Sequence, residues 1–271
     1  MHTRSPKGAA MSAERTTGDV SVSVGDDFVA TVEICRGPNN FFDLALIDAL
    51  AAAFEALDAD PACRAIVLCS EGKHFCAGAD FAGRKRTAVD DGGGRHLYDA
   101  ALRLFETRTP VVAALQGAAI GGGLGLALMP DFRVAAPEGR FAANFARLGF
   151  HHGFGLSVTL PALVGQQHAL ELLYTGRRIA ADEALAIGLV DEVAPLDRLR
   201  ERARARAVEI ALSAPLAVRS IRETMRGELP ARIRAATARE RAEQERLQHT
   251  ADFKEGIAAS AERRPPRFTG S

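Results

Sequence analysis

Two glycine-bearing turns could supply backbone hydrogen-bond donors to an anionic oxygen. Residues 75–80 read Phe-Cys-Ala-Gly-Ala-Asp, and residues 121–125 read Gly-Gly-Gly-Leu-Gly. Small residues leave main-chain N–H groups open to a ligand, because no large side chain stands in the way. Two such groups aimed at one carbonyl oxygen stabilise the negative charge that develops there during acyl chemistry. The pair of turns therefore predicts an oxyanion hole.

Each turn follows an apolar run that could hold it in place. Residues 65–69 precede the first turn and residues 111–115 precede the second, and both runs resemble strands. The second turn opens an apolar helical stretch that reaches Met129. The surrounding pattern predicts strands at residues 28–34, 132–135 and 140–143, and helices at 43–57, with Asp43 as the cap, and 95–107.

The predicted secondary structure changes in the second half of the chain. From Gln166 onward the pattern is almost wholly helical, with Ala- and Arg-rich stretches at 196–212, 215–226 and 230–249. This change predicts an α/β core at residues 20–195 and a helical C-terminal region at 196–271. Residues 1–19 are polar without periodicity, which predicts a disordered leader or an upstream start with Met11 as the true initiator.

Composition narrows the possible partners. Apolar residues make up 47% of the 271 residues, enough for a substantial core, and Lys plus Arg equal Asp plus Glu at 34 each. This balance argues against a nucleic-acid footprint or a polybasic membrane surface. No apolar span approaches the ~20 residues of a membrane helix. The four cysteines lack metal-ligand spacing, so we expect reduced core thiols in a cytoplasmic protein. The seven histidines form no compact ligand set, so we expect no metal.

Three other chemistries are disfavoured by their motifs. A dinucleotide fingerprint G-x-G-x-x-G fails because position 126 is Leu. A P-loop fails because the pair Gly72-Lys73 is followed by His74. Residues 155–159 match only the first half of the G-x-S-x-G elbow of α/β-hydrolases.

From about Val20 to Phe268, and most specifically at its two turns, the chain resembles the enoyl-CoA hydratase/isomerase, or crotonase, superfamily. This resemblance implies an α/β fold built as a spiral of ββα units, with C-terminal helices that form a homotrimer or a dimer of trimers. It implies an acyl-CoA thioester substrate, with coenzyme A as part of the substrate and no permanently bound cofactor. It also places the two oxyanion donors at Ala77 and Gly122.

The acids that the family uses are missing from their usual positions. The paired glutamates of family hydratases, which hold and activate water, correspond here to Gly125 and Phe145. The aspartate of other family members corresponds to Gly153. The resemblance therefore implies weak hydration and leaves isomerisation, C–C bond cleavage and thioester hydrolysis open.

Histidines are the candidate replacements for those acids. His151 and His152 lie near the expected thioester, and an imidazole with a pKa of ~6.5 can act as a base at neutral pH. His152 is favoured because it directly precedes the position of the missing aspartate. The alternative is that one histidine caps the helix starting near Phe154 while the other lies outside the pocket. Tyr98, Asn144 and Asp80 are further polar candidates.

Coenzyme A carries phosphates, so its site needs cations. The resemblance places a basic residue at Arg36, and Arg84 follows the first turn. The C-terminal basic-Pro-Phe signature ends in Arg267 and Phe268, which in the family reaches the coenzyme A of a neighbouring subunit. Each cation could equally be an ordinary solvated charge. The full predicted substrate-binding set is Arg36, Ala79, Asp80, Arg84, Tyr98, Phe145, Arg267 and Phe268.

Together these observations predict an acyl-CoA thioester-processing enzyme that uses a backbone oxyanion hole. Two alternatives remain: a histidine-dependent acyl-CoA isomerase or hydrolase, and a catalytically silent protein that binds acyl-CoA. Asp131 and Arg133 are expected to pair for structural reasons rather than to react.

Overall fold

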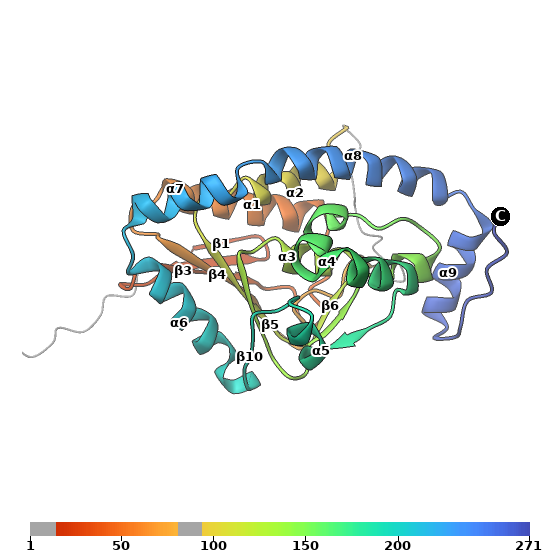
Figure 1. Cartoon of the computed structure of the whole chain (residues 1–271), viewed down its shortest axis with the longest axis horizontal. Helices are drawn as coiled ribbons and strands as arrows, with labels where there is room; N and C mark the ends of the chain where they lie inside the picture. Colours follow the sequence, from red (N-terminus) through yellow and green to blue (C-terminus); the bar gives the residue numbers. More distant parts are fainter. Residues whose placement is uncertain (1–14, 81–93) are drawn as a thin grey trace, which may run out of the picture.

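The computed structural model describes residues 15–80 and 94–271, which form two sheets surrounded by helices (Figure 1). Antiparallel pairing joins the first three strands of the larger sheet, and parallel pairing joins the rest. Its seven strands lie in the order β1 (Arg15–Thr17), β2 (Val20–Val24), β3 (Val29–Ile34), β4 (Ala65–Ser70), β5 (Val111–Leu115), β7 (Phe132–Ala135) and β10 (Glu192–Val193).

The chain winds between the two sheets in repeated ββα units. The smaller sheet contains β6 (Ala118–Ile120), β8 (Arg140–Ala142) and β9 (Ile179–Ala180). One unit runs β5, β6 and α3 (Gly122–Leu128); the next runs β7, β8 and, after the 3-10 helix η1 (Asn144–Leu148), α4 (Leu156–Thr175). Each unit gives one strand to each sheet, which confirms the predicted spiral.

The larger sheet is buried on both faces. Alternate residues of a strand point to opposite faces, so Val67 of β4 packs in one apolar cluster while Leu68 packs in another. The first cluster includes the small-residue stripe of α6 (Leu199–Ala211), where Ala203, Ala207 and Ala211 recur every fourth residue. The second contains α1 (Leu44–Ala59) and α2 (Leu97–Phe105). Burial on both faces explains why these strands read as continuous apolar runs.

The predicted strands and the longer helices are found close to their expected positions. Asp43 caps α1 as predicted, because its carboxylate accepts a hydrogen bond from Leu46 N at 2.9 Å. The C-terminal helices are α7 (Pro215–Arg226), α8 (Leu229–Leu247) and α9 (Ala251–Ala261), with the short α5 (Ala181–Ala186) and the 3-10 helix η2 (Leu196–Arg198) before them. In Figure 1, α7 and α8 run along one side of the molecule above α1 and α2.

Two sequence-based expectations need correction. Residues 15–17, placed in a disordered leader, form β1, because a tight turn at Gly18 lets them pair with the edge of β2. The region after Gln166 is not wholly helical, since β9 and β10 each add a short edge strand to one of the sheets. Such two-residue strands carry too little periodicity to be recognised from sequence. No helix within the described ranges is long and apolar enough to cross a membrane.

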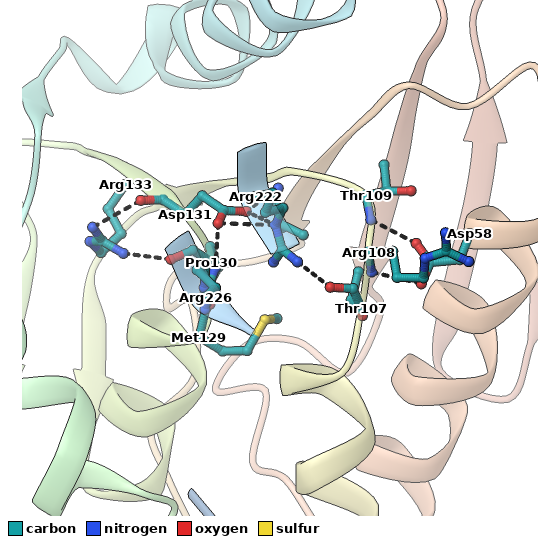
Figure 2. A network of polar contacts seen from close by, with 11 residues as sticks. Asp58, Thr107, Arg108, Thr109, Met129, Pro130, Asp131, Arg133, Arg222 and Arg226 are labelled. Atoms are coloured by element: carbon teal, nitrogen blue, oxygen red, sulfur yellow. Dashed lines mark hydrogen bonds and ion pairs between the residues drawn. The ribbon is translucent and has the colours of Figure 1, made fainter. Parts of the chain in front are cut away.

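Helix α7 is attached to the core by arginines rather than by apolar side chains. Arg222 and Arg226 both pair with the buried carboxylate of Asp131 (Figure 2). This carboxylate also accepts a hydrogen bond from Val111 N at 2.8 Å. Arg226 also donates to Met129 O at 2.8 Å. Burial alone would raise the pKa of Asp131, but the two guanidinium groups and the amide outweigh it and lower the pKa.

The second residue of the predicted pair, Arg133, is held mainly by other partners. Its side chain donates to Leu189 O and Pro130 O at 2.9 and 2.8 Å and pairs with Asp191 at 3.4 Å. The only direct bond to Asp131 is to the backbone carbonyl, at 3.3 Å. Both residues are structural, as expected, although their carboxylate and guanidinium do not pair with each other.

We predict that Asp131→Asn lowers the free energy of unfolding by roughly 3 kcal/mol, because it leaves two largely buried arginines without a counter-ion. The lowered pKa means that the Asp131 contribution is present above the unfolded pKa of ~3.9 and is lost as the pH falls through the folded pKa. Urea unfolding at pH 7, and at a series of pH values from 4 downward, measures both effects.

The matched control is Glu201→Gln, which breaks an exposed pair with Arg198 and should change stability by no more than about 0.5 kcal/mol. Equal effects of the two substitutions would contradict the structural role given to Asp131.

Candidate active site

The two turns are brought side by side by backbone hydrogen bonds. Phe75 N donates to Gln116 O at 2.8 Å, Cys76 N donates to Ala118 O at 3.0 Å, and Ile120 N donates back to Cys76 O at 3.1 Å. This short parallel pairing, with Cys76 opposite Ala119, extends the smaller sheet. The residues that follow each segment, 77–80 and 121–125, therefore enter one region of space.

The first turn exposes a different amide from the one predicted. Gly78 has a φ of 92°, and a Cβ there would lie 2.7 Å from Ile120 O, so only glycine fits. Ala77 N already donates to Asn39 O at 2.9 Å, and the prediction that it serves as an oxyanion donor is therefore wrong. Ala79 lies one residue beyond the glycine and lines the cavity, and no partner for its N–H is found among the described residues.

The second turn leads from the smaller sheet into helix α3. Gly121 has a φ of 58° and donates its N–H to Ala142 O at 2.8 Å. Gly122 begins α3, where the first amides of a helix have no intrahelical acceptor. A Cβ on Gly122 would lie 2.3 Å from the Phe42 ring, so a side chain is excluded. Within the described ranges the Gly122 amide has no protein acceptor and lines the cavity.

The turns open into a cavity of about 300 Å³ with mainly aromatic walls. The rings of Phe42 and Phe154 pack at 5.8 Å, and those of Phe145 and Phe150 pack at 5.4 Å. Most of the lining is apolar, which would strengthen any electrostatic interaction with a bound ligand. Its polar side chains, among the described residues, are Asp80, His96, Tyr98, Asn144, Gln244, Gln248 and Ser260.

Two glycines of this region are surrounded too closely to be replaced by acids without rearrangement. A Cβ on Gly125 would lie 2.6 Å from the Cβ of Phe154. A Cβ on Gly153 would lie 1.7 Å from the hydroxyl of Tyr98. The Tyr98 hydroxyl donates to Gln244 Oε1 at 2.8 Å, and burial raises the pKa of Tyr98, so this phenol keeps its proton.

The paired histidines lie outside the cavity that the turns enter. They line a separate hollow on the other side of Phe145 and Phe150. His152 Nε2 lies 2.8 Å from Ser157 Oγ, and burial together with the charge of His151 lowers the pKa of His152 to about 4. The prediction that either histidine acts as the base therefore does not fit the structure.

Neither histidine caps helix α4, because a distant carboxylate does so. Glu240 of α8 is fully buried and accepts hydrogen bonds from Gly155 N at 2.8 Å and from Ser157 N at 3.0 Å. It also accepts from Ser157 Oγ at 2.7 Å. Sequence reasoning missed this contact because 85 residues separate Glu240 from Gly155 and no local pattern links them.

His96 is a cavity residue that the sequence analysis did not single out. It caps α2, where its Nδ1 accepts a hydrogen bond from Tyr98 N at 3.1 Å and Asp99 completes a capping box. In the neutral ring that bond assigns the proton to Nε2. The pairing of a cap residue with an acid three positions later was the available sequence signal.

The predicted cations are not gathered at the cavity. Arg36 pairs with Asp19 at 2.6 Å and with Asp43 at 2.9 Å, so two carboxylates already offset its charge. Arg84 lies outside the described residues. Arg267 lines a separate surface depression beside Asp252 and Glu255.

Phe268 lies in a different depression, which borders the cavity. Its side chain is 42% exposed. This depression is also lined by Arg147, Arg178 and Arg263, and it shares Asn144 and Ser260 with the cavity. No group of three or more potential metal ligands is found in the parts of the chain that the structure covers.

Comparison with known proteins decides the family. The profile described as enoyl-CoA hydratase/isomerase matches residues 26–271. The chain belongs to the enoyl-CoA hydratase/isomerase family. A candidate enoyl-CoA hydratase of Thermus thermophilus is 39% identical over 233 residues, which cover 80% of this chain and 87% of that protein. A carnitinyl-CoA dehydratase of Salmonella typhi is 33% identical, with 89% and 95% covered.

Solved structures agree with this family assignment. The enoyl-CoA hydratase/isomerase of Pseudoalteromonas atlantica superposes with a TM-score of 0.82 at 32% identity and covers 93% of this chain and 100% of its own. An enoyl-CoA hydratase of Bacillus anthracis superposes with a TM-score of 0.72 at 33% identity, with 94% and 100% covered. The resemblance inferred from the two turns, and the crotonase fold expected from it, are confirmed.

We predict that Gly153→Ala lowers the free energy of unfolding by about 1–3 kcal/mol, because the new methyl group would overlap the Tyr98 hydroxyl. In the Tyr98→Phe background the same substitution should cost at most about half as much, since the overlapping oxygen is gone. A urea double-mutant cycle measures this coupling. An equal cost in both backgrounds would show that the two groups do not compete for this space.

Proposed function

We propose that this family member binds an acyl-CoA thioester with its carbonyl oxygen between the amides of Ala79 and Gly122. The observation that carries the proposal is a pair of amides for which residues 15–80 and 94–271 supply no acceptor, on adjoining turns that open into one aromatic cavity. Relatives of this chain carry the names of enoyl-CoA hydratases and of a CoA dehydratase, which supports a thioester substrate.

The two amides would stabilise an enolate or a tetrahedral oxyanion. When a proton leaves the carbon next to the thioester, negative charge moves to the carbonyl oxygen, where fixed N–H donors in an apolar cavity are most effective. Asp80 is the acidic residue among the described residues that line the cavity. Its carboxylate is therefore the candidate proton acceptor. Tyr98 retains its proton, which it donates in the hydrogen bond to Gln244, so it is not the proton acceptor.

The surroundings of the cavity argue against addition of water. Gly125 and Phe145 stand where the resemblance places the two hydratase acids, and neither can move a proton. Phe154 occupies the space beside Gly125, and Phe145 is buried in the aromatic wall. We therefore favour a reaction that needs no activated water, such as isomerisation or C–C bond cleavage.

A second candidate function is binding of acyl-CoA without turnover. The filled space beside Gly125 and Gly153 favours it, because a protein that keeps the oxyanion hole and lacks a proton-transfer group would bind the thioester and release it unchanged. Turnover of a CoA-thioester panel, compared with calorimetric binding of the same compounds, separates the two functions.

Removing the amide of Ala79 tests the oxyanion hole. We predict that Ala79→Pro, which deletes the N–H, lowers turnover of the best substrate about 10²–10³-fold, the usual effect of losing one oxyanion donor. If no substrate is turned over, the readout is the affinity for the same thioester. The matched control is Ala79→Gly, which keeps the N–H and should retain most of the activity. Similar losses in both variants would remove Ala79 from this role.

We expect hydration of crotonyl-CoA to be weak. Acid–base assistance contributes ~10²–10⁴-fold in enzymes, and neither Gly125 nor Phe145 can supply it. Loss of the conjugated enoyl absorbance measures the rate. His151→Ala and His152→Ala should leave turnover of any accepted thioester largely unchanged, since both residues line the separate hollow. Robust hydration, or a collapse of activity in either variant, would contradict this assignment.

We also propose assembly as a homotrimer or a dimer of trimers. The arginine face of α7 docks on the core, whereas Ile221 and Met225, one turn apart on another face, are 63% and 78% exposed. Exposed apolar neighbours of this kind mark a protein interface. Arg267 and Phe268 are also exposed, which would let them reach the substrate of a neighbouring subunit.

We predict that Ile221→Asp with Met225→Asp shifts the protein toward monomer in sedimentation equilibrium, because two charges would be buried in the interface. Ser220→Asp, an exposed position on the same helix, is the control and should leave the mass unchanged. A monomeric parent protein at micromolar concentration would refute the assembly.

A further inference from the structure

A wall of two phenylalanines separates the cavity from the histidine-lined hollow. Phe145 and Phe150 line both spaces, each residue is 7% exposed, and their ring centroids lie 5.4 Å apart in an edge-to-face arrangement. Phe253 supports the wall from the side, with its ring 5.2 Å from that of Phe150. The partition is therefore a packed structural feature held by its own aromatic contacts.

The wall stands directly beside the second oxyanion turn. A Cβ built on Gly121 would lie 3.7 Å from Phe145 Cζ, which places this ring in contact range of the residue before the Gly122 amide. Phe42 and Phe154 close other sides, next to Gly122 and Gly125. An acyl chain that leaves a carbonyl bound at Gly122 therefore meets aromatic rings within a short distance.

The space beyond the wall is suited to an alkyl chain. Its lining includes Leu170, Leu173 and Leu247, and its volume is about 640 Å³. The cavity on the near side, at about 300 Å³, lies at the lower end of the ~300–1,000 Å³ typical of ligand sites. The two spaces share the rings of Phe145 and Phe150, but Ala79 and Gly122 line the cavity and are absent from the described lining of the hollow.

We propose that Phe145 and Phe150 determine acyl-chain length, ending the acyl site after a compact apolar group and keeping longer chains out of the hollow. This inference rests on the proposed binding of an acyl-CoA thioester at Ala79 and Gly122. Phe145 would then set the specificity for chain length. When a smaller residue replaces Phe145, the chain of a longer thioester would enter the hollow.

The experiment is calorimetric binding of acetyl-, butanoyl-, octanoyl- and dodecanoyl-CoA to the full-length protein. The parent should bind butanoyl-CoA at least about tenfold more tightly than dodecanoyl-CoA, since the extra methylenes of the longer chain would have to displace packed rings of the wall. Phe145→Ala should reverse this order. Phe145→Leu, which keeps more of the packing, should move the preference in the same direction and serves if the alanine variant does not fold.

Two further variants identify where the longer chain lies. Phe145→Ala combined with Leu170→Trp narrows the hollow with a bulky ring and should shift the preference back toward butanoyl-CoA. The control is Phe132→Ala, which removes a ring of the same size from an exposed position that is absent from the described lining of both spaces, so it should retain the chain-length profile of the parent.

The outcomes distinguish this inference from the proposed function. If butanoyl-CoA binds the parent but neither Phe145 variant changes the profile, or the Trp variant leaves long-chain binding intact, the wall does not set the length. A parent that already prefers dodecanoyl-CoA also overturns the inference. If no thioester binds any of the proteins, the proposed function itself is refuted, and this inference falls with it.

Discussion

The short backbone ladder between residues 75–76 and 116–120 is the constraint on which the site depends. This ladder joins two successive units of the spiral. The turns that follow the two paired segments therefore meet at one cavity. Backbone donors need no particular side chain, but they need a fixed distance between two peptide groups. A shift of either segment by one residue would present a different amide to the cavity. The register matters because neighbouring amides differ: Ala77 N already donates to Asn39 O.

Aromatic packing gives the cavity its chemical character. Glycine at position 125 lets Phe154 approach, and glycine at position 153 admits the hydroxyl of Tyr98. The space in which an acidic side chain could stand is therefore occupied by the Phe154 ring and by the protonated hydroxyl of Tyr98. The result is a mainly apolar pocket, in which fixed amides would act more strongly on a bound oxygen than they would in bulk water.

The C-terminal helices complete the cavity and do not merely follow the core. Glu240 of α8 binds the start of α4, and one helical turn later Gln244 accepts a hydrogen bond from the Tyr98 hydroxyl. This buried carboxylate is stabilised by amides at a helix N-terminus, a favourable electrostatic setting. Helix α7 reverses the usual arrangement of an amphipathic helix. Its arginines face the core, and its apolar side chains face solvent.

The sequence by itself determined the family, the strands around each turn, the cap of α1 and the absence of acids at positions 125, 145 and 153. These follow from local periodicity, capping chemistry and residue identity, which need no knowledge of distant contacts. Which amide of the first turn lacks a partner, and on which side of Phe145 the histidines lie, were decided only by tertiary structure. Both depend on packing between segments far apart in the chain: the Asn39 carbonyl takes one donor, and a wall of two rings separates His152 from the turns.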